Sequence, residues 1–279
     1  APPSPARGEG EAVQLMIVAR DAHGLGDALE LGGAFQHHAA IELADSGRSV
    51  VLLEARQSGF GASGRNGGQA IHGLACDQSV IESQLGLAEA QRVWDLSIEA
   101  LDLIRQRIAR FGIDCDWRDG FLGVAIGERK ARELMDWADR TEAIYGYPTR
   151  RIGRSELPDW IASPRYAAAV HDPRSGHLHP LKYTLGLARA AADLGVRLHE
   201  DSAVLALAPG PRPVLRTAQG ELRAKQVLLA GNVYLQGIAP ALEARIMPAG
   251  TYIACSEPLP PALIDSLIPS RSAACDPAF

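Results

Sequence analysis

The sequence has little cysteine and no long apolar run. Its 279 residues include four cysteines, Cys76, Cys115, Cys255 and Cys275, which lie far apart and form no C-x-x-C pair or Cys/His cluster. This spacing excludes the familiar zinc modules and favours free thiols in a reducing compartment, so we expect a cytoplasmic protein. No stretch of about 18 apolar residues is present, so no membrane-spanning helix is expected.

A basic tract is also missing. The formal net charge is −5 and the isoelectric point about 5.9, which disfavours nucleic acid or an anionic membrane as the main partner. The first residues, Ala1-Pro2-Pro3-Ser4-Pro5, lack the charged and apolar regions of a signal peptide, so none is expected. Residues 1–24 are predicted to form a flexible lead-in.

The elements that are present predict an α/β protein. Ser49 to Glu54 is a nearly all-apolar run that follows a helical segment ending at Gly47, a pattern typical of a parallel strand buried on both faces. Further strands are predicted at 203–207 and 227–231 and a hairpin at 214–224. Helices are predicted at 80–111, 128–145 and 180–194.

The order of these elements indicates a discontinuous domain. The pattern of a nucleotide-binding domain begins near residue 25, breaks off near 80 and resumes near 165. We therefore predict one domain from 25–80 and 165–245, and a second, inserted domain from 81–164 and 246–279.

Two neighbouring features carry the chemistry. Glu54 ends the predicted strand, where an acid of a Rossmann unit accepts hydrogen bonds from the adenosine ribose; a surface acid that only ends a strand is the alternative. The segment 59–69, Gly-Phe-Gly-Ala-Ser-Gly-Arg-Asn-Gly-Gly-Gln, follows directly. Its glycines allow close approach of a flat ligand, and Arg65 offers a fixed positive charge to a pyrophosphate.

Val50 to Glu54 followed by Gly61 to Gln69 resembles the FAD-binding start of the D-amino-acid-oxidase-like flavoproteins. Within that family the sequence is most similar to the gamma-glutamylputrescine oxidoreductases, and the resemblance continues through Ser175–Leu181 and Val227–Tyr234 to about residue 269. It implies a Rossmann-like FAD-binding domain of the glutathione-reductase type with an inserted α+β substrate domain. It also implies oxidation of a small-molecule amine or amino acid by hydride transfer to FAD, followed by hydrolysis of the imine. Gamma-glutamylputrescine leads as substrate, with a D-amino acid or a glycine/sarcosine-type substrate as the alternative.

The resemblance also implies which residues hold FAD. Glu54 binds the adenosine ribose, the glycine-rich segment lines the pyrophosphate and isoalloxazine, and the main chain of Val204, placed in the strand 203–207, pairs with the adenine. The full set is Gly32, Gly33, Glu54, Ala62, Ser63, Arg65, Asn66, Gly67, Gly68, Gln69, Val204, Ala230 and Gly231. No catalytic residue is fixed by the pattern. His72 is a candidate to face the flavin.

No metal site is expected. His177 and His179 flank Leu178 and would share one face of a strand, but a third ligand is missing from the pattern. Polar residues at the entry of the helix that begins at Pro180 are the simpler interpretation.

The sequence departs from the family at two places. The expected G-x-G-x-x-G before Ala39 is reduced to Gly32 and Gly33, and the side chains of Gln36 or His37 would crowd the phosphates. The strand that precedes this motif lies either near 28–31 or at Val13–Ala19. The family's chains also continue well beyond Phe279, so we expect a C-terminally truncated substrate domain. Its strand near 251–256 would have an unpaired edge, open to self-association or a missing partner.

These departures leave a second interpretation: a truncated, degenerate flavoprotein fragment without catalytic activity. An NAD-dependent dehydrogenase is disfavoured because the glycine-rich segment after Glu54 has no role there.

Overall fold

The computed structural model describes residues 15–19, 35–235, 237–247 and 252–276. The chain divides into two compact units. Unit 1 comprises residues 1–65 and 184–251, and unit 2 comprises residues 66–183 and 252–279.

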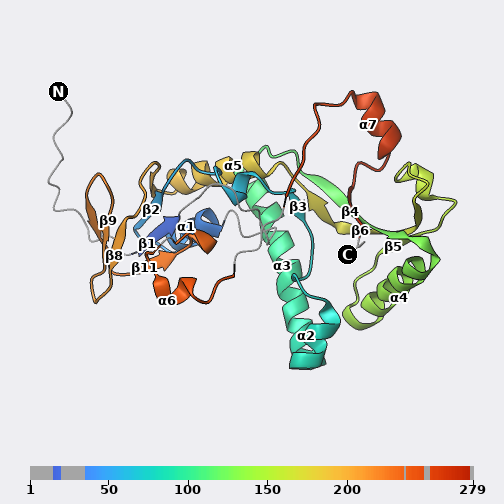
Figure 1. Cartoon of the computed structure of the whole chain (residues 1–279), viewed down its shortest axis with the longest axis horizontal. Helices are drawn as coiled ribbons and strands as arrows, with labels where there is room; N and C mark the ends of the chain where they lie inside the picture. The colour runs from blue at the N-terminus through green and yellow to red at the C-terminus, as the bar shows by residue number, and fades with distance from the viewer. Residues whose placement is uncertain (1–14, 20–34, 236, 248–251, 277–279) are drawn as a thin grey trace. The chain divides into compact units, whose positions relative to one another are not determined.

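Unit 1 is built on a parallel sheet of four strands in the order β11-β1-β2-β7 (Figure 1). The strands are β1 (Leu15–Ala19), β2 (Val50–Glu54), β7 (Arg197–His199) and β11 (Val227–Leu229). All five residues of β2 are buried, because the strand lies between β1 and β7. The apolar run is therefore the central parallel strand that the sequence predicts.

The other elements of unit 1 complete its core. Helix α1 (Phe35–Asp45) packs on β1 and β2, and a small antiparallel sheet consists of β8 (Ala206–Ala208), β9 (Val214–Arg216) and β10 (Glu221–Arg223). Leu215 and Leu222 face each other across the predicted hairpin. The core joins Val51 and Leu53 of β2 to side chains of these strands and their connections, namely Val204, Leu215, Ala224 and Ile238. Helix α5 (Pro180–Asp193) and the short helix α6 (Pro240–Glu243) complete the set.

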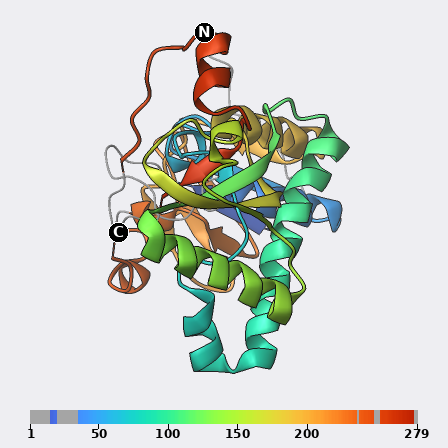
Figure 2. The ribbon, with the colours of Figure 1, turned by 90° about the vertical axis from the view of Figure 1, so that its right-hand side faces the viewer.

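Unit 2 contains a second sheet, in the order β12-β4-β6-β3, with β5 also paired to β6. Its strands are β3 (Gln69–Ala70), β4 (Arg118–Ile126), β5 (Arg150–Ile152), β6 (Tyr166–His177) and β12 (Ala273–Cys275). Helix α4 (Gly127–Tyr145) lies across one face, where alanines of the helix and sheet meet (Figure 2). The opposite face carries a larger apolar cluster that includes Leu122, Val124, Ile152 and Ala169.

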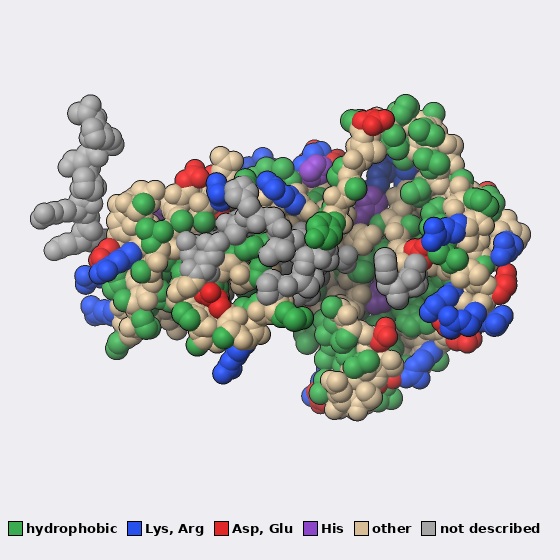
Figure 3. Space-filling view, in the orientation of Figure 1, with side chains coloured by type: hydrophobic (Ala, Val, Ile, Leu, Met, Phe, Trp, Pro, Cys, Tyr) green, Lys and Arg blue, Asp and Glu red, His purple; other side chains and the backbone are tan. Residues whose placement is uncertain are grey.

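The surface of α4 carries mixed charge. Arg129 and Lys130 pair with Glu133 along the helix, and Arg151 of β5 pairs with Glu142. Figure 3 shows Lys and Arg side chains (blue) and Asp and Glu side chains (red) interspersed on the surface of unit 2. Exposed pairs of this kind each contribute only about 0–1 kcal/mol, so α4 is held mainly by its apolar face.

Helices α2 (Gln78–Leu85) and α3 (Leu87–Phe111) form the predicted helix pair, and α7 (Pro261–Leu267) lies near the end of unit 2. Gly112 ends α3 with φ 58°, in the left-handed conformation that glycine adopts at helix ends.

The structure departs from the expectations at three places. The strand β1 lies inside the segment 1–24 that was predicted to be flexible; of the two positions considered for this strand, the one at Val13–Ala19 is confirmed. The two units divide at 65/66 and 183/184, whereas the predicted boundaries lie near 80 and 165, because β3 and β6 pair with each other in unit 2. Residues 252–256 form no strand; β12 pairs with β4 instead.

Candidate functional site

Acidic and glycine residues lie at the carboxyl ends of the parallel strands, at one edge of the sheet in unit 1. Glu54 ends β2, Glu200 follows β7, and Ala230-Gly231 follow β11. Because the four strands are parallel, these ends lie at the same edge, which is where open α/β sheets bind ligands. Gly231 is also the N-cap residue of the short 3-10 helix at Asn232–Tyr234.

Glu54 is a buried acid and does not simply end a strand at the surface. Its side chain is 1% exposed. Its Oε1 accepts a hydrogen bond from the backbone N–H of Arg56 at 3.0 Å, and its Oε2 accepts one from the amide of Gln36 at 3.4 Å. A buried carboxylate needs hydrogen-bond donors, so this position is suited to a ligand that brings hydroxyl groups.

Glu200 is a residue that the sequence pattern missed. Its Oε1 accepts a hydrogen bond from the backbone N–H of Ser58 at 2.8 Å and so joins the end of β7 to the loop after β2. The two residues are 142 positions apart, and no local motif marks the pair.

The segment 59–65 leads from this edge into a single 3-10 turn at Ala62–Gly64. Ser63 is buried, and its carbonyl accepts a hydrogen bond from the Thr184 hydroxyl at 3.0 Å. Arg65 is exposed, with its guanidinium 4.5 Å from the centre of the Phe60 ring. No carboxylate pairs with Arg65 among the residues that the structure describes, so its charge is available to an anion.

The two adjacent glycines, Gly67 and Gly68, differ in whether the packing around them leaves room for a side chain. Gly68 has φ +68°, and a Cβ there would stand 2.0 Å from the carbonyl oxygen of Leu178. Its backbone N–H donates to Asn66 Oδ1 at 2.8 Å, and its carbonyl accepts from the Leu178 N–H at 2.8 Å. A Cβ on Gly67 would meet nothing within 4 Å. The packing of the protein therefore requires Gly68, whereas the space at Gly67 is open to a ligand.

Substitution of these glycines tests that difference. G68A should lower the free energy of unfolding by at least about 3 kcal/mol, because it combines a left-handed conformation with a backbone clash. G67A should change it by less than about 0.5 kcal/mol. Urea unfolding followed by circular dichroism measures both values, and equal effects would contradict the assigned difference.

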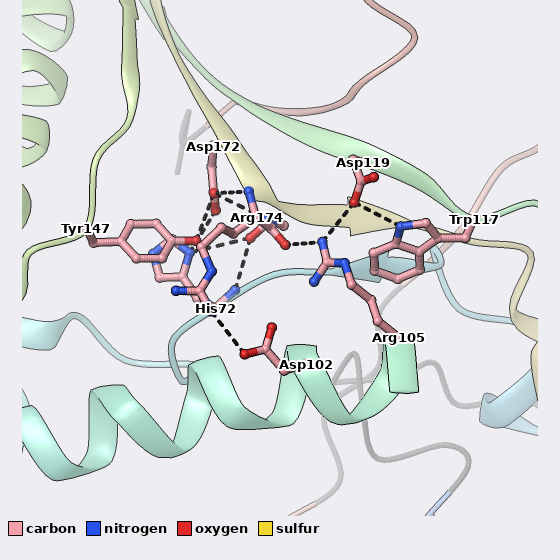
Figure 4. Close-up of polar contacts among 9 residues, drawn as sticks. His72, Asp102, Arg105, Trp117, Asp119, Tyr147, Asp172 and Arg174 are labelled. Carbon is pink, nitrogen blue, oxygen red and sulfur yellow. Dashed lines mark hydrogen bonds and ion pairs between the residues drawn. The ribbon is translucent and has the colours of Figure 1, made fainter. Parts of the chain in front are cut away.

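A cluster of buried polar and aromatic side chains surrounds His72 in unit 2 (Figure 4). His72 Nδ1 lies 2.9 Å from Asp172 Oδ2, and the Tyr147 hydroxyl donates to Asp172 Oδ1 at 2.8 Å. The imidazole also lies 4.7 Å from the rings of both Trp94 and Tyr147. His72 thus packs inside unit 2 against α3 and β6; its predicted role toward the flavin remains a prediction.

A more exposed set of polar contacts borders this cluster (Figure 4). Arg174 pairs with Asp102 of α3 at 3.0 Å. Arg105 pairs with Asp119 at 2.8 Å, and it also donates to the Arg174 carbonyl. These contacts join α3 to β4 and β6.

The remaining histidines of the sequence pattern do not form a metal centre. His177 Nε2 contacts the carbonyl of Arg271 at 2.9 Å, while His179 Nδ1 accepts from the N–H of Lys182 at 3.4 Å, at the start of α5. Among the described residues, no group of three or more His, Cys, Asp or Glu side chains has the arrangement of a metal site.

The start of α1 carries large side chains. Gln36 is 6% exposed and His37 is fully buried, with its Nε2 3.3 Å from the Ser58 hydroxyl. The Nδ1 atom of His37 is buried without a hydrogen-bond partner. The predicted cofactor residues Gly32 and Gly33 lie outside the described residues.

His37 should make the chain sensitive to acid. Burial lowers the pKa of His37 from 6.5 to about 4, so the folded state keeps the imidazole neutral while the unfolded state protonates near pH 6.5. The unfolded state then binds more protons below pH 6.5, and stability should fall by roughly 3 kcal/mol as the pH drops from 6.5 to 4.

H37Q keeps a polar group for Ser58 but does not titrate, so its unfolding free energy should fall less steeply over this range. Urea unfolding at several pH values measures the slopes, with the exposed His199 (H199Q) as control. Parallel curves for H37Q and the unmodified chain would contradict the interpretation.

Val204 differs from its predicted setting. It precedes β8, which begins at Ala206, so Val204 does not lie in a strand as predicted. Its side chain is fully buried in the core of unit 1. Its side chain therefore cannot reach a ligand, and the predicted contact with adenine would use its main chain.

The described residues fit FAD at some positions and not at others. The buried Glu54, the exposed Arg65 and the open space at Gly67 suit a ribose, a phosphate and a flat ring. The start of α1 fits poorly, because the Gln36 amide already donates to the Glu54 carboxylate, which the resemblance assigns to the ribose.

Comparison with known proteins defines the class. The family model described as FAD dependent oxidoreductase (DAO) matches residues 37–278, so the chain belongs to this family. It is 38% identical to gamma-glutamylputrescine oxidoreductase of Escherichia coli over 247 residues, covering 88% of this chain and 58% of the relative. It is 36% identical to probable oxidoreductase OrdL of Haemophilus influenzae over 250 residues, with the same coverage of 88% and 58%.

The chain spans somewhat more than half the length of these relatives. Among solved structures it resembles glycine oxidase from Geobacillus kaustophilus, with a TM-score of 0.62, 22% identity and coverage of 82% of this chain and 58% of the other. L-amino acid deaminase from Proteus vulgaris gives a TM-score of 0.61 at 23% identity, covering 85% and 52%. These likenesses establish the fold. Across the described part of the chain, no helix is long and apolar enough to cross a membrane.

Proposed function

We propose that this chain is the FAD-binding part of an oxidoreductase that oxidises the C–N bond of a small amine or amino acid. The observation that supports it most is the buried carboxylate of Glu54 at the carboxyl edge of the parallel sheet, followed at once by a glycine-rich segment with an exposed arginine. An acid and an arginine at this spacing match the ribose and the pyrophosphate of a dinucleotide.

Each predicted cofactor residue then has a distinct task. Glu54 would accept hydrogen bonds from the adenosine ribose, and Arg65 would pair with the pyrophosphate. The backbone at Ala62, Ser63 and Gly67 would approach the cofactor closely. Further contacts would come from Asn66, Gly68 and Gln69, from the main chain of Val204, and from Ala230-Gly231 after β11.

Bound FAD would supply the acceptor for the hydride that leaves the carbon bearing the amino group, and water would hydrolyse the resulting imine. The protein's part is to hold the cofactor and the amine in place and to exclude competing reactions. No described residue is assigned as a general base.

Gamma-glutamylputrescine is the leading substrate, supported by the relative of Escherichia coli that carries this name. The likeness to glycine oxidase supports the alternative of a D-amino acid or a glycine/sarcosine-type substrate at the level of fold alone.

A chain without catalytic activity is the second candidate. It is favoured by the contact of Gln36 with Glu54 and by the large buried side chains at the start of α1. The exposed apolar side chains of Met247 and Tyr252, 87% and 93% exposed, favour a further partner or self-association.

Variants of two arginines test the proposed site. R65A should weaken FAD binding about 10- to 100-fold, because a charge-assisted hydrogen bond to phosphate contributes about 1.5–3 kcal/mol. R48A is the matched control, because Arg48 is exposed just before β2, at the opposite end of that strand from Glu54. Quenching of flavin fluorescence on titration with the chain gives the dissociation constants. Equal constants for R65A and R48A would count against the site.

The reaction is tested on the chain loaded with FAD. Anaerobic addition of gamma-glutamylputrescine should bleach the flavin absorption, and glycine or a D-amino acid should do so if the alternative holds. A loaded chain whose flavin no amine reduces would favour the candidate without activity.

A further inference from the structure

The His72 cluster has no role in the proposed function as stated, yet its central carboxylate has a full set of hydrogen-bond donors. The carboxylate of Asp172 is 4% exposed and accepts four hydrogen bonds. Its Oδ1 receives the Tyr147 hydroxyl at 2.8 Å and the backbone N–H groups of Arg174 and Ser175 at 2.9 and 3.2 Å. Its Oδ2 receives His72 Nδ1 at 2.9 Å. A carboxylate held this way has little freedom to turn.

The charge state of the cluster is set by these contacts. Burial alone would raise the pKa of Asp172, but hydrogen bonds from His72, Ser175 and Tyr147 hold it well below its usual range. Burial and the neighbouring Asp172 raise the pKa of Tyr147. Asp172 is therefore ionised and Tyr147 neutral.

His72 connects this fixed carboxylate to the glycine-rich segment. The pairing of β3 with β6 is only two residues long, Gln69 opposite His177 and Ala70 opposite Gly176. The contact of Gly68 with Leu178 extends it at one end. At the other end the backbone N–H of His72 donates to the Ser175 hydroxyl at 3.3 Å, and its ring reaches Asp172. A strand this short makes few main-chain hydrogen bonds, so the hydrogen bond between the His72 and Asp172 side chains contributes much to holding it on β6.

We propose that His72 is a positioning residue that, through Asp172, fixes the segment Asn66–Gln69 along β6 for cofactor binding. The hydrogen bond of its imidazole to Asp172 sets how firmly the segment is held. This inference rests on the proposed function only for the identity of the cofactor, since the tie itself is between described residues of unit 2.

The surroundings of the imidazole determine the direction of the effect. Asp172 and Ser175 face it from β6, Tyr147 from the loop before β5, Trp94 from α3 and Trp137 from α4. The nearby guanidinium of Arg174 pairs with Asp102 and lies 5.8 Å from the Tyr147 ring. A bond to an ionised carboxylate is charge-assisted, so loss of the His72 contact should loosen the segment.

Hydrogen exchange on the flavin-free chain tests this directly. Amides of residues 69–72 should be about fivefold more protected in the unmodified chain than in H72A, which removes the imidazole. H72N keeps a donor near the Nδ1 position, so its protection should stay close to that of the unmodified chain. D172N should lose protection as H72A does, and S175A serves in its place if D172N does not fold.

His171 is the matched control, because it neighbours Asp172 on β6 but packs its ring on Trp160 at 4.7 Å. H171N should behave as the unmodified chain. The proposal is overturned if H72A keeps the protection of the unmodified chain, or if H171N loses it equally.

The dissociation constant of FAD separates this inference from the proposed function. A constant about fivefold higher in H72A than in the unmodified chain, with H72N close to the unmodified chain, supports the positioning role. Equal constants in H72A and the unmodified chain contradict it. A chain that binds no FAD overturns the proposed function, while the exchange experiment still decides what His72 does.

Discussion

A buried parallel strand that ends in a carboxylate is the constraint on which the rest of unit 1 depends. Burial of Val50 to Leu53 between β1 and β7 fixes the direction of β2 and brings Glu54 to the carboxyl edge. The chain leaves this edge through residues 59–65, which contain Gly59, Gly61 and Gly64 and end at Arg65. The acid and the arginine of the proposed cofactor site are therefore close in sequence.

Two buried carboxylates show different ways of satisfying a charge. The four hydrogen bonds of Asp172 described above come from unit 2 itself, from His72, Tyr147 and two backbone N–H groups. Glu54 has a backbone donor close by and a second, longer contact with the Gln36 amide. The Asp172 arrangement is typical of a residue that holds structure. At Glu54, the Gln36 amide occupies a carboxylate that the proposed function assigns to the adenosine ribose.

Local pattern predicts much of this architecture. The apolar run at β2, the hairpin of β9 and β10, and the helix predicted at 128–145 each follow from nearby residues, and the structure confirms them. The family resemblance on Glu54 and Gly61–Gln69 is confirmed by the match to the FAD-dependent oxidoreductase family. A short motif sufficed because the chemistry of a dinucleotide site is itself local along the chain.

Contacts between distant segments were beyond prediction. His72 and Asp172 are 100 residues apart, and nothing in either local sequence marks them as partners. Gly120 is a bulge within β4, with φ +106° and no room for a Cβ beside His171 and Ser272, and these neighbours are distant in sequence. The position of strand β1 was left open between two segments because Leu15–Ala19 is not followed by the usual glycine motif.

The visible absorption spectrum of the purified chain, recorded after incubation with FAD and desalting, tests the central claim most directly. The account predicts that a flavin band remains with the protein, because Glu54, Arg65 and the open backbone at Gly67 hold the cofactor despite the side chains at the start of α1. A folded chain that is colourless after desalting would contradict it, and would mean that the side chains of Gln36 and His37 block FAD binding at the carboxyl edge of the sheet.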